Sequence, residues 1–194
     1  MRDSLRREDV LPRLHGRFGR EYLYAEVCPS TQRLLAPDAP EGAVAVAEEQ
    51  TEGRGRLGRR WFSPPRKSVL CSVQLRPPVP PPHLPELSLV AGEACAEAIA
   101  AVTGLDPAIK LPNDVLLDGR KVAGILAEAN EGRVVLGIGI NVNLTEDELP
   151  RDVHVPATSL LLETGTRVDR TDVLVELLDR LERRYDEWLA RYGA

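Results

Sequence analysis

One segment of the chain combines glycine and arginine at very short spacing. Gly53 to Trp61 reads Gly-Arg-Gly-Arg-Leu-Gly-Arg-Arg-Trp. Glycines let backbone N–H groups approach an anion, and guanidinium groups bind carboxylate or phosphate through paired hydrogen bonds. The segment therefore predicts a loop that closes over a phosphate-bearing ligand. It is neither a Walker A loop, because no Gly-Lys-Ser/Thr follows, nor a dinucleotide fingerprint in a βαβ unit.

The same residues leave another interpretation open. Alternating glycine and arginine before Trp61 is also typical of a solvated basic loop, or of a nucleic-acid contact in which the indole stacks on a base. The chain carries 25 Lys+Arg against 30 Asp+Glu, a formal net charge of −5. This balance argues against a general nucleic-acid binder.

Two polar residues follow a proline in the stretch 110–114, Lys-Leu-Pro-Asn-Asp. Pro112 favours an extended conformation before it, which places Asn113 and Asp114 at the mouth of a strand. Their side chains suit contacts to a nucleotide or its metal ion. A simple turn is the alternative interpretation.

Lys121 comes shortly after Asp118-Gly119, a strong hairpin signal. The residue could be an ordinary surface lysine on an edge strand. Gly124 favours a ligand site nearby, because a glycine inside a strand weakens it unless another group must come close.

The stretch Val134 to Val142 has the alternation of a strand with two different faces. One face is apolar and belongs to the core. The other face offers small residues and amides on which a flat ligand could lie, although a helix packed on glycines would explain it too. This second face carries Val135, Gly137, Gly139, Asn141 and Asn143.

Ser30-Thr31-Gln32 follows Pro29 and begins a predicted helix, with Ser30 as its N-cap. Capping alone explains the serine. If this end of the helix opens onto a pocket, its hydroxyls and amides are suited to a small polar ligand.

These residues must be positioned by an α+β domain with a mixed, mainly antiparallel sheet flanked by helices. Thr171 is predicted to cap the last helix and Gly193 to end it, Asn130-Glu131-Gly132 to be a tight connection, and 77–82 to be polyproline II. The predicted strands are Tyr22 to Val27, Ala43 to Glu49, Val69 to Leu75, Val115 to Leu117, Lys121 to Glu128 and Val134 to Val142, and the helices Ser30 to Ala36, Leu84 to Val102 and Thr171 to Tyr192.

Several protein classes are excluded by composition. No apolar stretch approaches the ~20 residues of a membrane span, and the N-terminus lacks the apolar region of a secretory signal, so we expect a cytoplasmic location. Cys28, Cys71 and Cys95 show no metal-ligand spacing and are expected to be structural thiols.

Taken together, five motifs resemble, in order, the catalytic domain of biotin protein ligases, from about Tyr22 to Leu162. The resemblance implies a class II synthetase-like α+β fold, with residues 1–194 forming one biotin/lipoate ligase-type catalytic domain. The motifs are Ser30-Thr31-Gln32, Gln50 with 53–61, 110–114, Lys121-Val122-Ala123-Gly124-Ile125-Leu126 and Gly137-Ile138-Gly139-Ile140-Asn141.

What the resemblance implies is acyl transfer in two steps. Biotin and ATP with Mg²⁺ would form biotinyl-5′-AMP, and a lysine of a biotin carboxyl carrier domain, as in acetyl-CoA carboxylase, would then accept biotin. Among enzymes the alternative is a lipoate or octanoyl ligase, but the loop at 53–61 favours biotin over lipoate. Outside enzymes it is a non-catalytic biotin or biotinyl-adenylate binding module.

The resemblance also implies residue roles. The catalytic residues would be Lys121, Arg56 and Asp114, with Asp114 also a Mg²⁺ ligand. Biotin would be bound by Ser30, Thr31, Gln32, Gln50, Gly53, Arg54, Arg56, Lys121 and Gly124. ATP and the adenylate would be bound by Arg54, Arg56, Arg59, Trp61, Asn113, Asp114, Lys121 and Asn141.

The chain departs from the family pattern in three places. Leu111 stands where tryptophan is usual, which predicts a looser wall of the biotin pocket. We expect no N-terminal helix-turn-helix domain, hence no DNA partner, and no C-terminal SH3-like domain. A homodimer formed through the sheet edge is left open.

Overall fold

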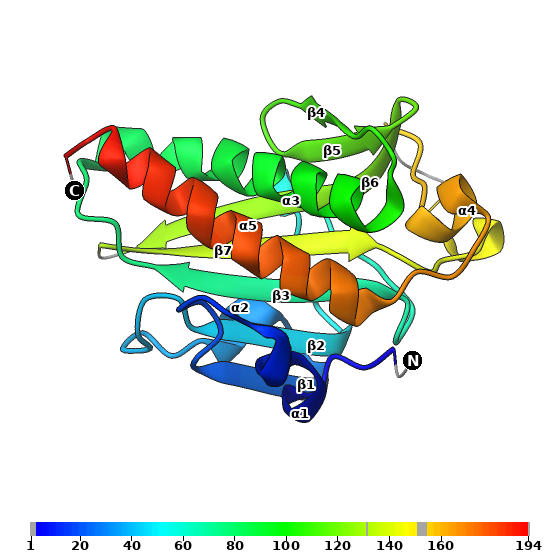
Figure 1. Cartoon of the computed structure of the whole chain (residues 1–194), viewed down its shortest axis with the longest axis horizontal. Helices are drawn as coiled ribbons and strands as arrows, with labels where there is room; N and C mark the ends of the chain where they lie inside the picture. Colours follow the sequence, from blue (N-terminus) through cyan, green and yellow to red (C-terminus); the bar gives the residue numbers. More distant parts are fainter. Residues whose placement is uncertain (1–2, 131, 151–154, 194) are drawn as a thin grey trace.

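The structure, a computed structural model, describes residues 3–130, 132–150 and 155–193. A seven-stranded sheet in the order β1-β2-β3-β7-β6-β5-β4 runs through its centre (Figure 1). β1 and β2 are parallel, and the other neighbouring pairs are antiparallel, which confirms the mixed, mainly antiparallel sheet. The strands are β1 (Tyr22–Cys28), β2 (Val44–Gln50), β3 (Ser68–Leu75), β4 (Ala108–Lys110), β5 (Asp114–Leu117), β6 (Arg120–Asn130) and β7 (Arg133–Asn141).

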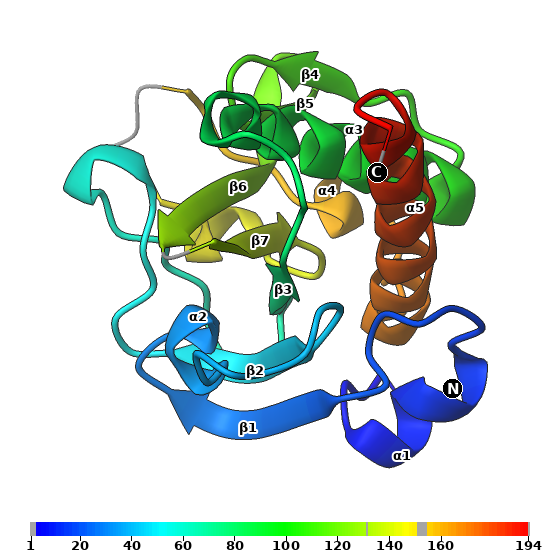
Figure 2. The ribbon, with the colours of Figure 1, turned by 90° about the vertical axis from the view of Figure 1, so that its left-hand side faces the viewer.

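Two long helices, α3 (Leu87–Thr103) and α5 (Arg170–Ala190), pack side by side on one face of the sheet (Figures 1 and 2). Between them and the sheet lies the main core. The shorter helices are α1 (Arg7–Val10), α2 (Thr31–Leu34) and α4 (Leu160–Thr164), and 3₁₀ turns occur at Leu11–Arg13, Arg56–Gly58, Pro81–Glu86 and Glu146–Glu148.

The alternation predicted for β7 is confirmed. Val134, Leu136, Ile138 and Ile140 belong to the main core. Val135 points the other way, into a small cluster with Ala45 and residues of and after α2. Because successive side chains of a strand face opposite sides, α2 lies on the face of the sheet opposite α3 and α5.

The predicted turn at Asp118-Gly119 is present. Both residues have positive φ, 47° and 73°, as the tight connection of β5 to β6 requires. The predicted connection at 130–132 contains residue 131, which lies outside the described residues.

Several predictions about helices were wrong. α2 is a single turn, because the chain is extended again at Leu35. The proline-rich run is not polyproline II throughout: Pro81 and Pro82 begin a 3₁₀ turn, where a missing N–H costs nothing. The short elements α1, α4 and β4 were not predicted, because three to five residues carry too little periodicity.

The cap of α5 was also assigned to the wrong residue. The side chain of Asp169 accepts a hydrogen bond from the Thr171 N–H at 2.8 Å and is the N-cap. The Thr171 hydroxyl donates instead to the Ser4 carbonyl oxygen at 2.7 Å. The helix ends at Ala190, and Gly193 follows in a separate turn with φ of 70°.

Within the described ranges, no helix has both the length and the apolar character needed to cross a membrane.

Candidate functional site

A cavity of about 490 Å³ lies over β6 and β7, on the glycine-bearing face of β7. This volume is typical of a small-molecule site. Its lining comes from α2, from the ends of β2 and β5, from the middle of β6 and β7, and from the segment between β2 and β3. The five motifs of the sequence, although distant along the chain, therefore meet at one place.

The segment 51–62, which we name the glycine–arginine hairpin, forms one wall of the cavity. Its two arms are joined by backbone hydrogen bonds, from the Gly55 N–H to the Arg59 carbonyl at 2.7 Å and from the Trp61 N–H to the Gly53 carbonyl at 2.9 Å. At its tip Leu57 has φ of 58° and is exposed. The hairpin extends from the sheet on the side away from α5 (Figure 2).

Trp61 lies flat on the glycine floor of the cavity. A Cβ atom added to Gly139 would lie 2.5 Å from the Trp61 ring, and one added to Gly124 would lie 2.8 Å from it. Only glycine allows this approach. The close contact that Gly124 predicts is therefore present, and the group that makes it is the indole.

Lys121 carries the positive charge nearest to this floor. Its Nζ lies 5.5 Å from the centroid of the Trp61 ring and 2.6 Å from Asp114 Oδ1. Both charged side chains are largely buried, with 26% of Lys121 and 19% of Asp114 exposed. Attraction between them is therefore screened less than at the open surface.

Asn113 connects the hairpin with β6. Its Oδ1 accepts a hydrogen bond from Arg56 Nη1 at 3.2 Å, and its Nδ2 donates to the Ile125 carbonyl at 2.9 Å. Arg54 reaches the same strand further along, where its Nη1 lies 3.0 Å from Glu128 Oε1. Arg59 and Arg60 also line the cavity. The hairpin thus adds guanidinium groups to the Lys121 charge.

The other end of the cavity is uncharged and polar. Gln50 Oε1 accepts from the Thr31 N–H at 2.8 Å, and the Thr31 hydroxyl lies 2.7 Å from the Ser72 hydroxyl. Gln32 Nε2 donates to the Leu126 and Val135 carbonyls at 3.3 and 3.4 Å. These bonds hold the side chains in fixed orientations.

Ser30 occupies the N-cap position of α2, yet its side chain makes no capping hydrogen bond. The residue is buried, with 2% of its surface exposed, and it lines the cavity. Capping therefore does not account for the hydroxyl, and the ligand interpretation is favoured.

All but one of the predicted site residues line the cavity. The exception is Gly53, where an added Cβ would lie 2.3 Å from the Trp61 carbonyl oxygen, so this glycine serves the close approach of the hairpin arms. Asn141 lines the floor while its Nδ2 donates to the Thr158 carbonyl at 3.0 Å. Leu111 does not line the cavity and is 68% exposed, and the looser wall expected from leucine in place of tryptophan stays a prediction.

The site also contains residues that were not predicted as ligand contacts. The alternation of β7 pointed to Gly137 and Gly139. Gly55, Arg60, Ile125, Leu126 and Ile138 lie within the five motifs, although no role was predicted for them. No pattern pointed to Phe62, Cys71, Pro150, Val155 and Ala157, because they reach the cavity only through tertiary packing.

Cys71 is not a nucleophile in this cavity. Burial raises the pKa of its thiol to about 12, so the thiol stays protonated at neutral pH. Cys28 and Cys95 are also buried, and burial raises the pKa of each. These observations agree with structural thiols.

The chain is similar to one protein family and to several known proteins. The Biotin/lipoate A/B protein ligase family matches residues 24–144. The bifunctional ligase/repressor BirA of Bacillus spizizenii is 40% identical over 180 residues, which cover 88% of this chain and 55% of that protein. A biotin--[acetyl-CoA-carboxylase] ligase of Mycobacterium tuberculosis is 42% identical over 152 residues, 76% of this chain and 56% of that protein.

A solved structure shares the fold. Biotin protein ligase from Aquifex aeolicus in complex with biotin and ATP has a TM-score of 0.79 and 35% identity, covering 87% of this chain and 72% of that chain. The seven-stranded mixed sheet and its helices thus match the fold of biotin protein ligase structures.

The chain belongs to the Biotin/lipoate A/B protein ligase family, and its resemblance to the biotin protein ligases is confirmed. It spans about half the length of the curated relatives that it matches.

Proposed function

We propose that the chain activates biotin with ATP and transfers the biotinyl group to a lysine of a biotin carboxyl carrier domain. One observation carries the proposal: the cavity joins a cationic end, with Lys121 and the hairpin arginines, to a polar uncharged end over a glycine floor. The Aquifex relative is described in complex with biotin and ATP. Those ligands match the two ends of the cavity.

In the first step a biotin carboxylate oxygen attacks the α-phosphorus of ATP. The new O–P bond replaces the bond from the α-phosphorus to the bridging oxygen, and pyrophosphate leaves. Two anions must meet, so the site needs cations that stay in place as charge moves to the leaving group. Lys121, Arg54 and Arg56 would supply them, with Arg59 near the outer phosphates.

The uncharged end would bind the ureido ring. Ser30 offers a buried hydroxyl without a capping bond, and Thr31 and Gln50 are held by each other. Preorganised hydrogen-bonding groups select a ligand because they lose no freedom when it binds. Gln32 would close this end, and Gly124 and Asn141 would line the floor of the cavity beneath the ligand.

Asp114 would be the protein ligand for Mg²⁺, with Asn113 beside it. Asp114 is the single carboxylate among the described lining residues, and those ranges contain no cluster of three or more metal-ligating side chains. This fits Mg²⁺, which is commonly held by one or two carboxylates together with substrate phosphates. When bound, the ion would neutralise charge on the phosphates.

In the second step the carrier lysine attacks the biotinyl carbonyl. A C–N bond forms, the C–O bond to phosphate breaks, AMP leaves and the amine loses its proton. The glycine–arginine hairpin would cover the mixed anhydride and keep water from it until the lysine arrives. Trp61 would pack near the adenine.

The test is biotin-dependent exchange of labelled pyrophosphate into ATP, with lipoate and no acid as controls. Exchange with biotin alone supports the proposal. Exchange with lipoate alone would replace it with a lipoate ligase. Calorimetric binding of biotin without exchange would identify a binding module instead.

A further inference from the structure

Glu128 lies on the same face of β6 as Gly124 and Leu126, outside the cavity lining. Glu128 lies four positions along the strand from Gly124, a distance of about 13 Å. Trp61 rests on the first position, and Arg54 pairs with the second at 3.0 Å. The glycine–arginine hairpin is therefore fastened to β6 at two separate places, with the cavity wall at Leu126 between them.

The two fastening points are coupled through the hairpin backbone. The backbone of Arg54 forms an antiparallel β-bridge with the backbone of Arg60 on the opposite arm. The carbonyl of the neighbouring Gly53 accepts a hydrogen bond from the Trp61 N–H. An added Cβ on Gly53 would collide with the Trp61 carbonyl, so the arms are in direct contact there. A movement of the Arg54 backbone away from β6 therefore shifts Trp61 as well.

The Arg54–Glu128 pair is exposed, with 52% of the Arg54 side chain and 39% of the Glu128 side chain accessible to solvent. Such a pair adds little to the stability of the whole fold. It is well suited to a contact that must break when a ligand enters and form again afterwards.

We propose that Glu128 is a positioning residue, which holds Arg54 across the cavity mouth and so keeps the hairpin and Trp61 closed over the bound acyl-adenylate. Glu128 touches none of the reacting groups and acts through Arg54. The adenylate part of this inference rests on the proposed function, whereas the position of the hairpin can be measured without any ligand.

The chain provides a matched control on the same hairpin. Glu52 pairs with Arg33 of α2 at 2.6 Å and is 58% exposed. Glu52→Gln removes the same charge from a similarly exposed ion pair, but it leaves Arg54 and Trp61 on β6. Glu128→Gln removes the contact across the cavity mouth.

Acrylamide quenching of tryptophan fluorescence reports hairpin opening directly. The chain has two tryptophans, and Trp188 is fully buried, so the quenchable emission comes from Trp61. Acrylamide is neutral, so the lost carboxylate does not affect its access. We expect Glu128→Gln to raise the quenching constant about twofold, the scale of a lost exposed ion pair, and Glu52→Gln to leave it unchanged. Equal quenching in both variants and in the wild type would overturn the proposal.

A second measurement follows the adenylate. Labelled biotinyl-adenylate is formed on the protein and its escape is timed on a filter, with labelling of bystander lysines as a second readout. We expect faster escape and more bystander labelling from Glu128→Gln than from Glu52→Gln, at equal urea midpoints. Equal escape from the two variants would contradict a role in retention. If the wild type forms no adenylate, the proposed function fails, and the quenching result still decides whether Glu128 positions the hairpin.

Discussion

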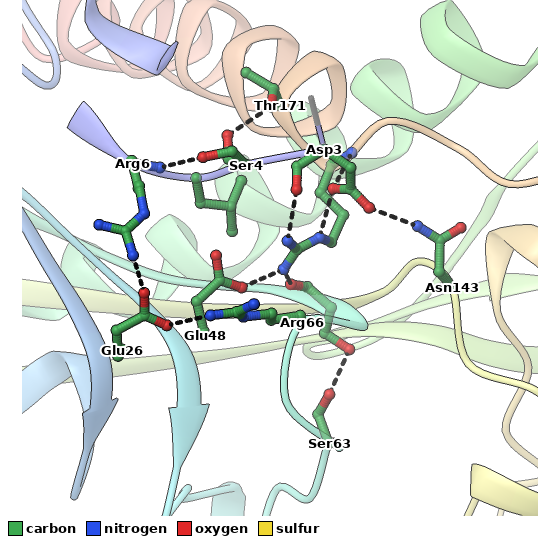
Figure 3. Close-up of polar contacts among 12 residues, drawn as sticks. Asp3, Ser4, Arg6, Glu26, Glu48, Ser63, Arg66, Asn143 and Thr171 are labelled. Atoms are coloured by element: carbon green, nitrogen blue, oxygen red, sulfur yellow. Dashed lines mark hydrogen bonds and ion pairs between the residues drawn. The ribbon is translucent and has the colours of Figure 1, made fainter. Parts of the chain in front are cut away.

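Arginine serves two different purposes in two regions of this protein. Arg170, at the start of α5, is 1% exposed and is surrounded by acceptors: Asp3 at 2.7 Å, Glu48, and the Ser68 carbonyl at 3.3 Å. Figure 3 shows Asp3 and Glu48 pointing to one guanidinium group from opposite directions. The arginines of the glycine–arginine hairpin are exposed and have few partners.

The difference shows which charges are available to a ligand. Burial alone would lower the pKa of Arg170, but its hydrogen bonds to Glu48 and Asp3, together with their negative charges, raise the pKa above its usual value. Its donors are committed to joining the N-terminal segment, β2, β3 and α5. Within the described ranges Arg54 and Arg56 each pair with one side chain, so other donors of each guanidinium group remain for an anion.

The largest effect is expected in the buried region. Arg170→Leu leaves the buried Glu48 without its cation and Asp3 with the exposed Arg167, and removal of one partner from a buried ion pair costs about 3–5 kcal/mol. Urea unfolding should show this loss. Arg6→Leu breaks an exposed pair with Glu26 and should change stability by less than about 1 kcal/mol. If both variants lost equally little unfolding free energy, the buried arginine would not differ from the exposed one in its contribution to stability.

Activity should depend on the cavity charges and not on global stability. Lys121→Ala is expected to lower biotin-dependent pyrophosphate exchange by about 10²–10³-fold, the scale of one electrostatic group at a reacting centre. The control variant is Lys110→Ala, because Lys110 is exposed and lies outside the cavity lining. Its exchange rate should equal that of the wild type. If folded Lys121→Ala exchanged pyrophosphate at the wild-type rate, the role of Lys121 in biotin activation would be wrong.

The glycine floor offers a steric test. Gly139→Ala would place a methyl group against the Trp61 ring, and overpacking of this kind costs about 1–3 kcal/mol. The ring should leave the floor, and biotin affinity measured by calorimetry should fall about tenfold, which is 1.4 kcal/mol. Gly92→Ala in α3 meets its neighbours at an ordinary 3.9 Å and should leave binding unchanged. Unchanged affinity in Gly139→Ala would show that the ring position does not matter.

The smallest effect concerns a region between these extremes. Glu148 accepts hydrogen bonds from the Thr145 N–H at 2.9 Å and hydroxyl at 3.0 Å, and it pairs with Lys67 beyond the hairpin at 3.3 Å. The Thr145 backbone bond, with smaller contributions from its hydroxyl and from Lys67, lowers the pKa of Glu148.

A carboxyl whose pKa is lower in the folded state stabilises the fold above its unfolded pKa, about 4.3. This contribution is lost as the pH falls through the folded pKa. Glu148→Gln should therefore cost about 1 kcal/mol at pH 7, as for loss of a cap, and nothing in strong acid. Urea titrations at several pH values measure the difference. If the difference in unfolding free energy between the wild type and Glu148→Gln did not change with pH, the effect would come from side-chain packing and not from the charge of Glu148.

Some features of the fold could be predicted because they are local. The alternation of β7 and the turn at Asp118-Gly119 depend on neighbouring residues, and both are present. The cap of α5 was missed because Asp169 and Thr171 both suit that position, and the choice depends on Ser4, which is distant along the chain.

The sequence by itself determined the family, the α+β class and about half of the residues that line the cavity, because residue type and spacing encode strands, turns and the chemistry of the site. Tertiary structure alone decided the pairing of Asp3 with Arg170, the placement of Trp61 on Gly139 and the partner of Arg54 on β6. These contacts join residues far apart in the chain. They depend on which surfaces are buried together, and no local pattern records that.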